Sequence, residues 1–319
     1  MATSASIGFI GLGVMGGPMC RNMAAKHPGS LLALDIDPSA VSALADTPAR
    51  PAPSMAALAR VSDVIFLSLP GGAQVEAVCC GDGGILANAR SGTMVVDLST
   101  TSVATARQVG ERLEALGLSF ADAPVARTRE AARRGQLSIM VGASDAVFAR
   151  IKPLLEHIGS DVTHCGGIGA GQVVKLINNT LVFEHVVALA EMMVAAERAG
   201  VAPGTLLDAV SKGSGDSFVL RNHGMKAMLP RQFPAQAFSP EYVLKDIGYM
   251  LELATSQGVS ARQAETARTY YEAALGHGLS GRYFPSVIEV VERHGLDVAE
   301  SDRARWGRDA PKAGDGSPA

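Results

Sequence analysis

The chain has 319 residues, 47% of them hydrophobic, and a formal net charge of -3 at pH 7. This length and composition suffice for a sizeable buried core, and we expect two domains. The small negative charge gives no electrostatic reason to expect a nucleic-acid partner or an anionic membrane. The four cysteines form no CxxC pair and no zinc-like spacing with histidine, so we expect no metal site and a reduced, cytoplasmic setting.

The N-terminal segment predicts a strand, a glycine-rich turn and a helix in direct succession. The apolar run Ser6–Ile10 is followed by the pattern GxGxxG over residues 11–16 and by a helix-like segment, Met19–Ala25. The pattern alone is weak, but between a strand and a helix it is typical of dinucleotide-binding βαβ units. We expect no signal peptide, because only a few residues precede this strand.

Each glycine of this turn has a physical role. Gly11 permits the tight turn, Gly13 lets the backbone approach a pyrophosphate, and Gly16 allows the helix to pack closely. The helix N-terminus then faces the anion. We therefore predict a dinucleotide at this turn, with Leu12 and Met15 contacting it beside the three glycines.

The second predicted strand, Leu31–Leu34, ends at Asp35. A carboxylate at this position can accept hydrogen bonds from both ribose hydroxyls and repels a 2′-phosphate, which predicts NAD(H) rather than NADP(H). The alternative is that Asp35 only shapes the turn Asp35-Ile36-Asp37-Pro38.

Further apolar runs predict strands over residues 64–69, 93–96, 118–121 and 138–141, with helical segments between them. This alternation predicts an α/β fold with a Rossmann-type, doubly wound parallel sheet. Ligands of such sheets bind beyond the carboxyl ends of the strands, which favours Leu69, Pro70 and Thr100 as cofactor contacts. Ordinary turn chemistry could also explain the proline and glycines at 70–72.

The loop over residues 122–135 follows a strand end and is therefore expected to face the cofactor. It contains four arginines. An arginine beside a ligand offers a permanently charged, bidentate partner for a carboxylate, sulfonate or phosphate. Arg129, Arg133 and Arg134 fit a solvated helix, so we expect Arg127 to bind the ligand.

After the last predicted strand, small residues lead into an apolar helix that we expect to begin near Ala170 and stop at Gly200. Asn178 and Asn179 lie three and four positions after Lys175 on it, so the three side chains can meet one ligand. A solvated surface lysine is the ordinary alternative. Polar residues also interrupt the apolar run that a membrane span needs.

The rest of the chain predicts further helices, one opening at Ser239-Pro240 and another over Ala261–Gly276. We therefore expect a Rossmann domain over residues 1–165 and an all-helical substrate and dimerisation domain over 166–296. The composition of residues 297–319 predicts a disordered tail.

Together these features resemble the β-hydroxyacid dehydrogenase family, which includes 3-hydroxyisobutyrate dehydrogenase and tartronate semialdehyde reductase. The resemblance implies an NAD-dependent oxidoreductase with Lys175 as catalytic acid/base and Asn179 orienting the substrate. It also implies Thr100 and Lys245 near the cofactor, although composition alone would leave Lys245 a solvated residue. The resemblance rests on four ordered segments, Gly8–Gly16, Asp122–Val125, Gly169–Asn179 and Lys245-Asp246.

One segment departs from the family pattern. Most of the family continues Asp-Ala-Pro-Val with Ser-Gly-Gly, which holds the substrate carboxylate, whereas this chain has Ala126-Arg127-Thr128. The segment is similar to the Gly-Arg-Thr loop of 3-sulfolactaldehyde reductases, where the arginine meets the sulfonate. The resemblance implies Ala126, Arg127 and Thr128 as substrate contacts and 3-sulfolactaldehyde as a candidate substrate.

We predict hydride transfer between a nicotinamide and the carbon of a small anionic aldehyde or alcohol. Lys175 would give or take the oxygen-bound proton, and Asn178 and Asn179 would orient the substrate. Apolar surroundings and the helix N-terminus favour the neutral amine.

Three alternatives remain at this point: a carboxylate semialdehyde substrate, a non-catalytic dinucleotide-binding protein, and an imine reductase. The chain lacks the GxSxG, HExxH and Walker A patterns, so hydrolase and nucleoside-triphosphatase functions have no support. The long apolar helix predicts a homodimer or homotetramer.

Overall fold

The computed structural model describes residues 5–235 and 237–293. The chain divides into two compact units. The sheet unit comprises Met1–Thr180 and Asp246–Ser260, and the helical unit comprises Leu181–Lys245 and Ala261–Ala319. The predicted tail, residues 297–319, lies outside the described residues.

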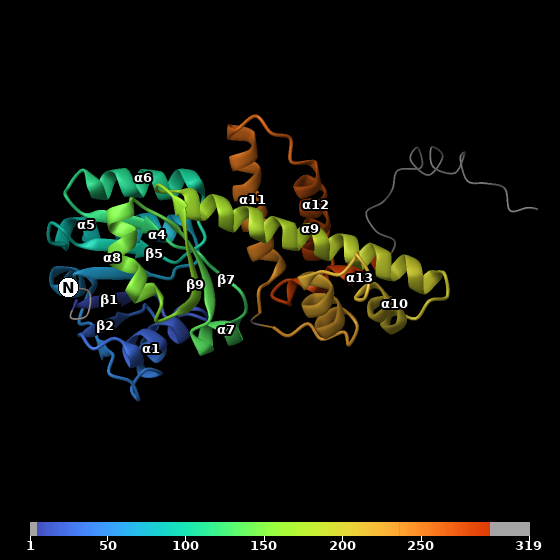
Figure 1. Cartoon of the computed structure of the whole chain (residues 1–319), viewed down its shortest axis with the longest axis horizontal. Coiled ribbons are helices and arrows are strands. Elements are labelled where there is room, and N and C mark those ends of the chain that lie inside the picture. Colours follow the sequence, from blue (N-terminus) through green and yellow to red (C-terminus); the bar gives the residue numbers. More distant parts are fainter. Residues whose placement is uncertain (1–4, 236, 294–319) are drawn as a thin grey trace, which may run out of the picture. The chain divides into compact units, whose positions relative to one another are not determined.

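The sheet unit is built around a mostly parallel sheet (Figure 1). Within the described residues the sheet has nine strands in the order β3-β2-β1-β4-β5-β6-β8-β7, with β9 paired to β8. The pairs from β3 to β6 are all parallel, as in a doubly wound dinucleotide-binding fold. The strands are β1 (Ile7–Ile10), β2 (Leu31–Leu34), β3 (Arg50–Pro51), β4 (Val64–Leu67), β5 (Met94–Asp97), β6 (Ser119–Asp122), β7 (Val125–Ala126), β8 (Leu137–Gly142) and β9 (Gly159–Gly166).

The predicted α/β fold class is confirmed, and the far edge of the sheet adds a feature that the sequence did not predict. Strand β8 runs antiparallel to β6 and β7, while β9 runs parallel to β8. The short strands β3 and β7 have two residues each, and β9 is largely polar and partly exposed. None of the three has an apolar run or alternation from which a strand could be predicted.

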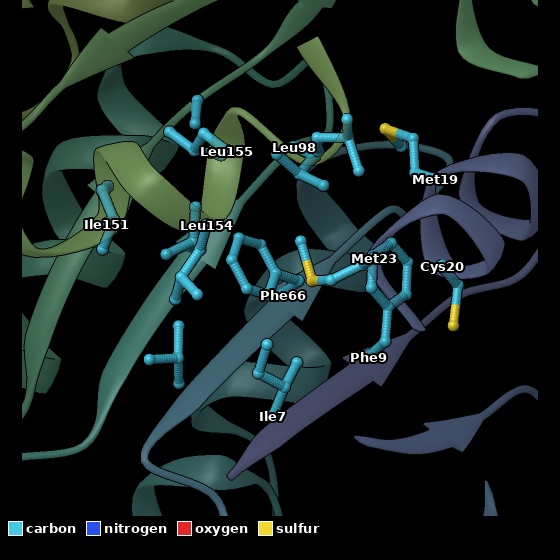
Figure 2. Close-up of a cluster of buried hydrophobic side chains, with 14 of the residues drawn as sticks. Ile7, Phe9, Met19, Cys20, Met23, Phe66, Leu98, Ile151, Leu154 and Leu155 are labelled. Atoms are coloured by element: carbon cyan, nitrogen blue, oxygen red, sulfur yellow. The ribbon is translucent and has the colours of Figure 1, made fainter. Parts of the chain in front are cut away.

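The core lies on both faces of the sheet, because alternate strand residues point to opposite sides. On one face Phe9 stacks on Phe66 with ring centroids 6.1 Å apart, and α1 and α8 cover them (Figure 2). On the other face Ile65 and Phe120 pack under α3, α4 and α6. Strands β1, β4 and β5 are buried at every position, as expected for a sheet covered on both faces.

Several helices of the sheet unit begin at side-chain caps. The hydroxyls of Ser54, Ser102 and Ser144 each accept a hydrogen bond from the backbone amide three residues on, which satisfies one of the amides that a helix start leaves open. The helices are α1 (Gly16–Lys26), α2 (Pro38–Ser42), α3 (Met55–Val61), α4 (Gly72–Cys80), α5 (Ile85–Asn88), α6 (Val103–Glu114), α7 (Arg129–Arg134) and α8 (Asp145–Leu155).

Helix α9 (Ala170–Arg198) has 29 residues and belongs to both units. It begins where the sequence predicts, and Gly200 just after it takes a φ of 86°, a left-handed conformation that suits a helix stop. Among the described helices, α9 has the length and apolar composition of a membrane span. Length and composition alone do not distinguish a membrane span from the core helix of a soluble protein, and 44% of the apolar window of α9 is buried inside the structure.

The helical unit packs around aromatic side chains. Phe183 of α9 lies between Phe238, Tyr271 and Phe284, with ring centroids 5.5 to 6.2 Å from its own. The predicted helix starts at Pro240 and near Ala261 are confirmed, while the π-helix η2 was not predicted. The elements are α10 (Pro203–Val210), η2 (Leu220–Met228), α11 (Pro240–Ser256), α12 (Arg262–Gly276), η3 (Phe284–Val287) and α13 (Ile288–Glu292).

Candidate active site

The turn between β1 and α1 has the geometry that its three glycines predict. Gly11 has a φ of 93°, and a Cβ there would collide with the carbonyl oxygen of Ser68. A Cβ at Gly16 would collide with the Gly11 carbonyl oxygen, whereas one at Gly13 would meet no atom within 4 Å. The tight turn, the close helix packing and the open approach to the backbone therefore all fit a dinucleotide pyrophosphate.

Asp35, the residue after β2, holds this turn by hydrogen bonds. One carboxylate oxygen accepts a hydrogen bond from the Leu12 amide at 2.5 Å, and the other accepts one from the Asp37 amide at 2.8 Å. The second bond is the turn contact that we considered as the alternative role. Each oxygen has a further lone pair, so these bonds leave Asp35 able to accept from ribose hydroxyls.

A cavity of about 540 Å³ opens beside the glycine turn, within the usual size range of small-molecule sites. Two arginines line it: Arg21 is 2.7 Å from Asp46, and Arg133 is 3.8 Å from Glu130. The cavity is lined by Leu12, Gly13, Val14, Gly17, Pro18, Arg21, Ala40, Ala43, Leu44 and Arg133.

The loops after β4 and β5 are tied together at the carboxyl edge of the sheet. The Leu69 amide donates to the Ser99 hydroxyl at 2.9 Å, and the Ser99 amide donates to Asp97 at 3.0 Å. Pro70 is exposed and Thr100 is half-buried. The predicted cofactor contacts after β4 and β5 therefore follow strands that are neighbours in the sheet.

Gln172, which the sequence analysis did not single out, links α9 to the same edge. Its side chain is fully buried, donates to the Ser99 carbonyl at 2.9 Å and accepts from the Thr101 amide at 3.1 Å. The helix that carries Lys175 is thereby attached to the loop that carries Thr100. In the sequence, the only sign of this role is that a polar glutamine stands near the start of an apolar helix.

Lys175 and Asn179 are each 8% exposed and lie one turn apart on α9, as predicted. The Asn179 side-chain amide donates to the Asp246 carboxylate at 2.7 Å, and the Asn178 side-chain amide donates to the Asn179 side-chain oxygen at 3.1 Å. Asp246, on α11, is 1% exposed. Burying these groups is costly unless they are paired, so this cluster is a built polar site rather than a solvated surface.

In the loop after β7, the Arg127 side chain is paired within the protein. The Arg127 guanidinium donates to Asp161 at 2.7 Å, to Ser160 at 2.8 Å and to the Gln136 carbonyl at 2.7 Å. The Thr128 hydroxyl caps α7 by accepting from the Ala131 amide.

The unpredicted strand β7 explains this pairing. Because Ala126 pairs with Ser138 of β8, the next residue lies beside the starts of β8 and β9, where Asp161 offers a carboxylate. Ala126 itself is 8% exposed. Arg127 has a φ of 85°, a left-handed conformation that favours glycine.

Lys245 is the last residue of the helical unit before the division, and its ammonium lies 6.0 Å from the Tyr242 ring centroid. The part of α11 that follows it belongs to the sheet unit, where the Gly72 amide donates to the Tyr249 hydroxyl at 3.4 Å. Within the described residues no group of three or more His, Cys, Asp or Glu side chains could hold a metal ion.

The structure combines a doubly wound sheet, a glycine turn shaped for a pyrophosphate and a buried lysine on α9. These features are those of a dinucleotide-binding oxidoreductase. Residues 6–167 match the NAD binding domain of 6-phosphogluconate dehydrogenase, and residues 169–291 match the NAD-binding domain of NADP-dependent 3-hydroxyisobutyrate dehydrogenase. The chain belongs to the β-hydroxyacid dehydrogenase family.

Similar proteins span nearly the whole chain. It is 35% identical to 2-(hydroxymethyl)glutarate dehydrogenase of Eubacterium barkeri, over 92% of this chain and 97% of that protein. It is 32% identical to 2-hydroxy-3-oxopropionate reductase of Escherichia coli, over 90% and 97%. The solved Mycobacterium tuberculosis 3-hydroxyisobutyrate dehydrogenase with L-serine has a TM-score of 0.79 at 29% identity, over 90% and 99%.

Proposed function

We propose that this chain transfers a hydride between NAD(H) and a small anionic β-hydroxyacid or its semialdehyde. The observation that carries the proposal is the buried pair Lys175 and Asn179, on a helix tied to the loop that carries Thr100. When bound, the dinucleotide supplies or accepts the hydride. The NAD(H) preference over NADP(H) rests on Asp35 at the end of β2.

The protein residues supply proton transfer and orientation. In reduction the Lys175 ammonium gives a proton to the carbonyl oxygen and becomes the neutral amine, and in oxidation the neutral amine takes the proton from the hydroxyl. Asn178 and Asn179 orient the substrate oxygens, and Asp246 fixes the Asn179 amide by its hydrogen bond. Low exposure of this cluster keeps bulk water from competing for those hydrogen bonds.

The substrates named for the relatives share one chemical feature. In 2-(hydroxymethyl)glutarate, 3-hydroxyisobutyrate and 2-hydroxy-3-oxopropionate, the alcohol or aldehyde carbon is bonded to the carbon that bears a carboxylate. We infer the same arrangement for the substrate of this chain, because it belongs to the same family over nearly its full length.

A sulfonate substrate, 3-sulfolactaldehyde, is the second candidate. The loop Ala126-Arg127-Thr128 supports it, because a guanidinium can bind two sulfonate oxygens. The ion pair between Arg127 and Asp161 opposes it, since Arg127 would have to exchange one anion for another. We therefore rank the carboxylate substrates first.

The test is an assay of purified protein with NADH and, separately, NADPH. The substrates are methylmalonate semialdehyde, tartronate semialdehyde, 2-formylglutarate, 3-sulfolactaldehyde and a cyclic imine. We expect turnover with the aldehydes and NADH, with carboxylates ahead of the sulfonate. Turnover of the imine alone would assign the chain to imine reduction, and binding of NADH without any turnover would indicate a non-catalytic dinucleotide-binding protein.

A further inference from the structure

The Asp122 carboxylate lies where β6 ends and α9 begins. It is fully buried, and its two oxygens accept hydrogen bonds from the Gly169 amide at 2.6 Å and the Gln172 amide at 2.8 Å. These amides belong to the start of α9, where a helix has no internal acceptors for its N–H groups. A residue some fifty positions earlier in the chain thus provides acceptors for the start of the helix that carries Lys175.

Glycines leave the space that this carboxylate occupies. A Cβ at Gly142 would collide with Asp122, and a Cβ at Gly171 would lie 2.8 Å from the same carboxylate. Gly169 takes a φ of 91°, which turns its amide toward the carboxylate at a conformation that other residues rarely adopt. The small residues before α9 therefore shape a fitted cradle for one carboxylate, which a flexible linker would not need.

We propose that Asp122 is a positioning residue, whose carboxylate fixes the first turn of α9 and thereby the place of the Lys175 amine relative to the loop that carries Thr100. This inference rests on the proposed function. Gln172 completes the attachment. Its backbone amide donates to Asp122, while its side-chain amide bonds to the loop at Ser99 and Thr101. Lys175 follows one turn later, too close to the anchor for the helix to absorb a displacement.

Ionisation of Asp122 offers a readout. Burial raises the pKa of this carboxyl to about 6, although the amide hydrogen bonds act to lower it. Asp97 is its register neighbour on β5, and Cys165 on β9 interacts with it electrostatically. Arg107 lies beside Gly169, and Lys175 follows on α9. As pH falls through about 6, the carboxylate takes up a proton and becomes a weaker acceptor for the helix amides.

The experiment compares Asp122→Asn with Asp145→Asn, which removes a fully exposed carboxylate from the first turn of α8. Asparagine keeps one acceptor oxygen but turns an N–H₂ group toward a helix amide. We expect kcat of Asp122→Asn to fall by about 10- to 100-fold, because small displacements of a catalytic group cost this much. The NADH Kd should change by less than about twofold, since the glycine turn is separate. Asp145→Asn should match the wild type.

The pH profile separates positioning from general stability. The wild-type kcat should decrease as pH falls through about 6, and Asp122→Asn should lose this limb of the profile. Hydrogen exchange over residues 166–176 should be faster in Asp122→Asn than in Asp145→Asn. Normal kcat and normal exchange in Asp122→Asn would overturn the inference while leaving the proposed function intact.

Two further outcomes are decisive. If the wild type turns over none of the aldehydes, the proposed function fails, and the exchange comparison still tests whether Asp122 anchors α9. If Asp122→Asn does not fold, the wild-type protection factors over residues 166–176 carry the test. These protection factors should decrease as the pH is lowered through about 6. Constant protection from pH 5 to 8 would refute the claim that Asp122 fixes the start of α9.

Discussion

Lys175 is 8% exposed, although a lysine is ordinarily a surface residue. We predict that Lys175→Ala lowers kcat by about 10²-fold or more, because the substrate oxygen loses its proton donor and acceptor. The NADH Kd should stay close to that of the wild type, since the glycine turn is unchanged. Steady-state kinetics and fluorescence titration measure both quantities.

A matched control for Lys175 is Lys152→Ala. Lys152 lies on the surface of α8, 3.9 Å from Glu156, and its side chain is 48% exposed. Surface ion pairs contribute little, so this variant should keep wild-type kcat. Near-normal turnover by Lys175→Ala would remove the central claim about the mechanism.

Arg127 decides between the two substrate classes. If a sulfonate binds this guanidinium, Arg127→Ala should raise KM for 3-sulfolactaldehyde by about 10-fold or more, the loss expected for a charge-assisted hydrogen bond. Asp161→Ala should lower the same KM, because it releases Arg127 from its ion pair. If the substrate is a carboxylate semialdehyde, as we propose, neither variant should change KM by more than about twofold.

At the scale of the element, most of the framework could be predicted from sequence. Strands β1, β2 and β4 carry apolar runs that are long enough to identify, and α9 begins and ends at small residues. The contacts of Arg127 within the protein could not be predicted, because they depend on β7, which has two residues. Asp122 and Gln172 act through contacts distant in sequence, which local patterns do not encode.

The attachment of α9 to the β5–α6 loop supports a prediction about Gln172. In Gln172→Met, the Ser99 carbonyl and the Thr101 amide lose their partner while remaining near the buried core. Each unpaired buried group costs about 1–3 kcal/mol, so with two groups unpaired the free energy of unfolding should fall by about 2–6 kcal/mol. Urea unfolding measures it, with KM for NADH as a second readout.

The control for Gln172 is Gln257→Met, because Gln257 is exposed just after α11, where its side-chain amide donates to the Ser256 hydroxyl. Its unfolding midpoint should match that of the wild type within error. Equal midpoints for the two methionine variants would show that Gln172 does not hold the loop.

For the whole molecule, α9 presents an apolar stripe. Val174, Ile177 and Leu181 are 40%, 43% and 50% exposed and lie three or four positions apart. Exposed apolar side chains in one stripe mark an interaction surface, and homo-oligomers are the commonest assemblies. We predict a homodimer or homotetramer, and Ile177→Glu should lower the mass measured by light scattering. A monomeric wild type at micromolar concentration would contradict this prediction.

The division of the chain has three boundaries, and two of them cut helices: one between Thr180 and Leu181 in α9 and one between Lys245 and Asp246 in α11. The third lies between Ser260 and Ala261, after α11. Neither unit is therefore a module that evolution or an engineer could exchange by cutting a loop. A chain ending at Thr180 would keep Lys175 on a helical stub too short to be stable alone, and Asn179 would lose Asp246. Chimeras between family members should tolerate junctions in surface loops, such as that before α10, far better than a junction at the boundary of the units.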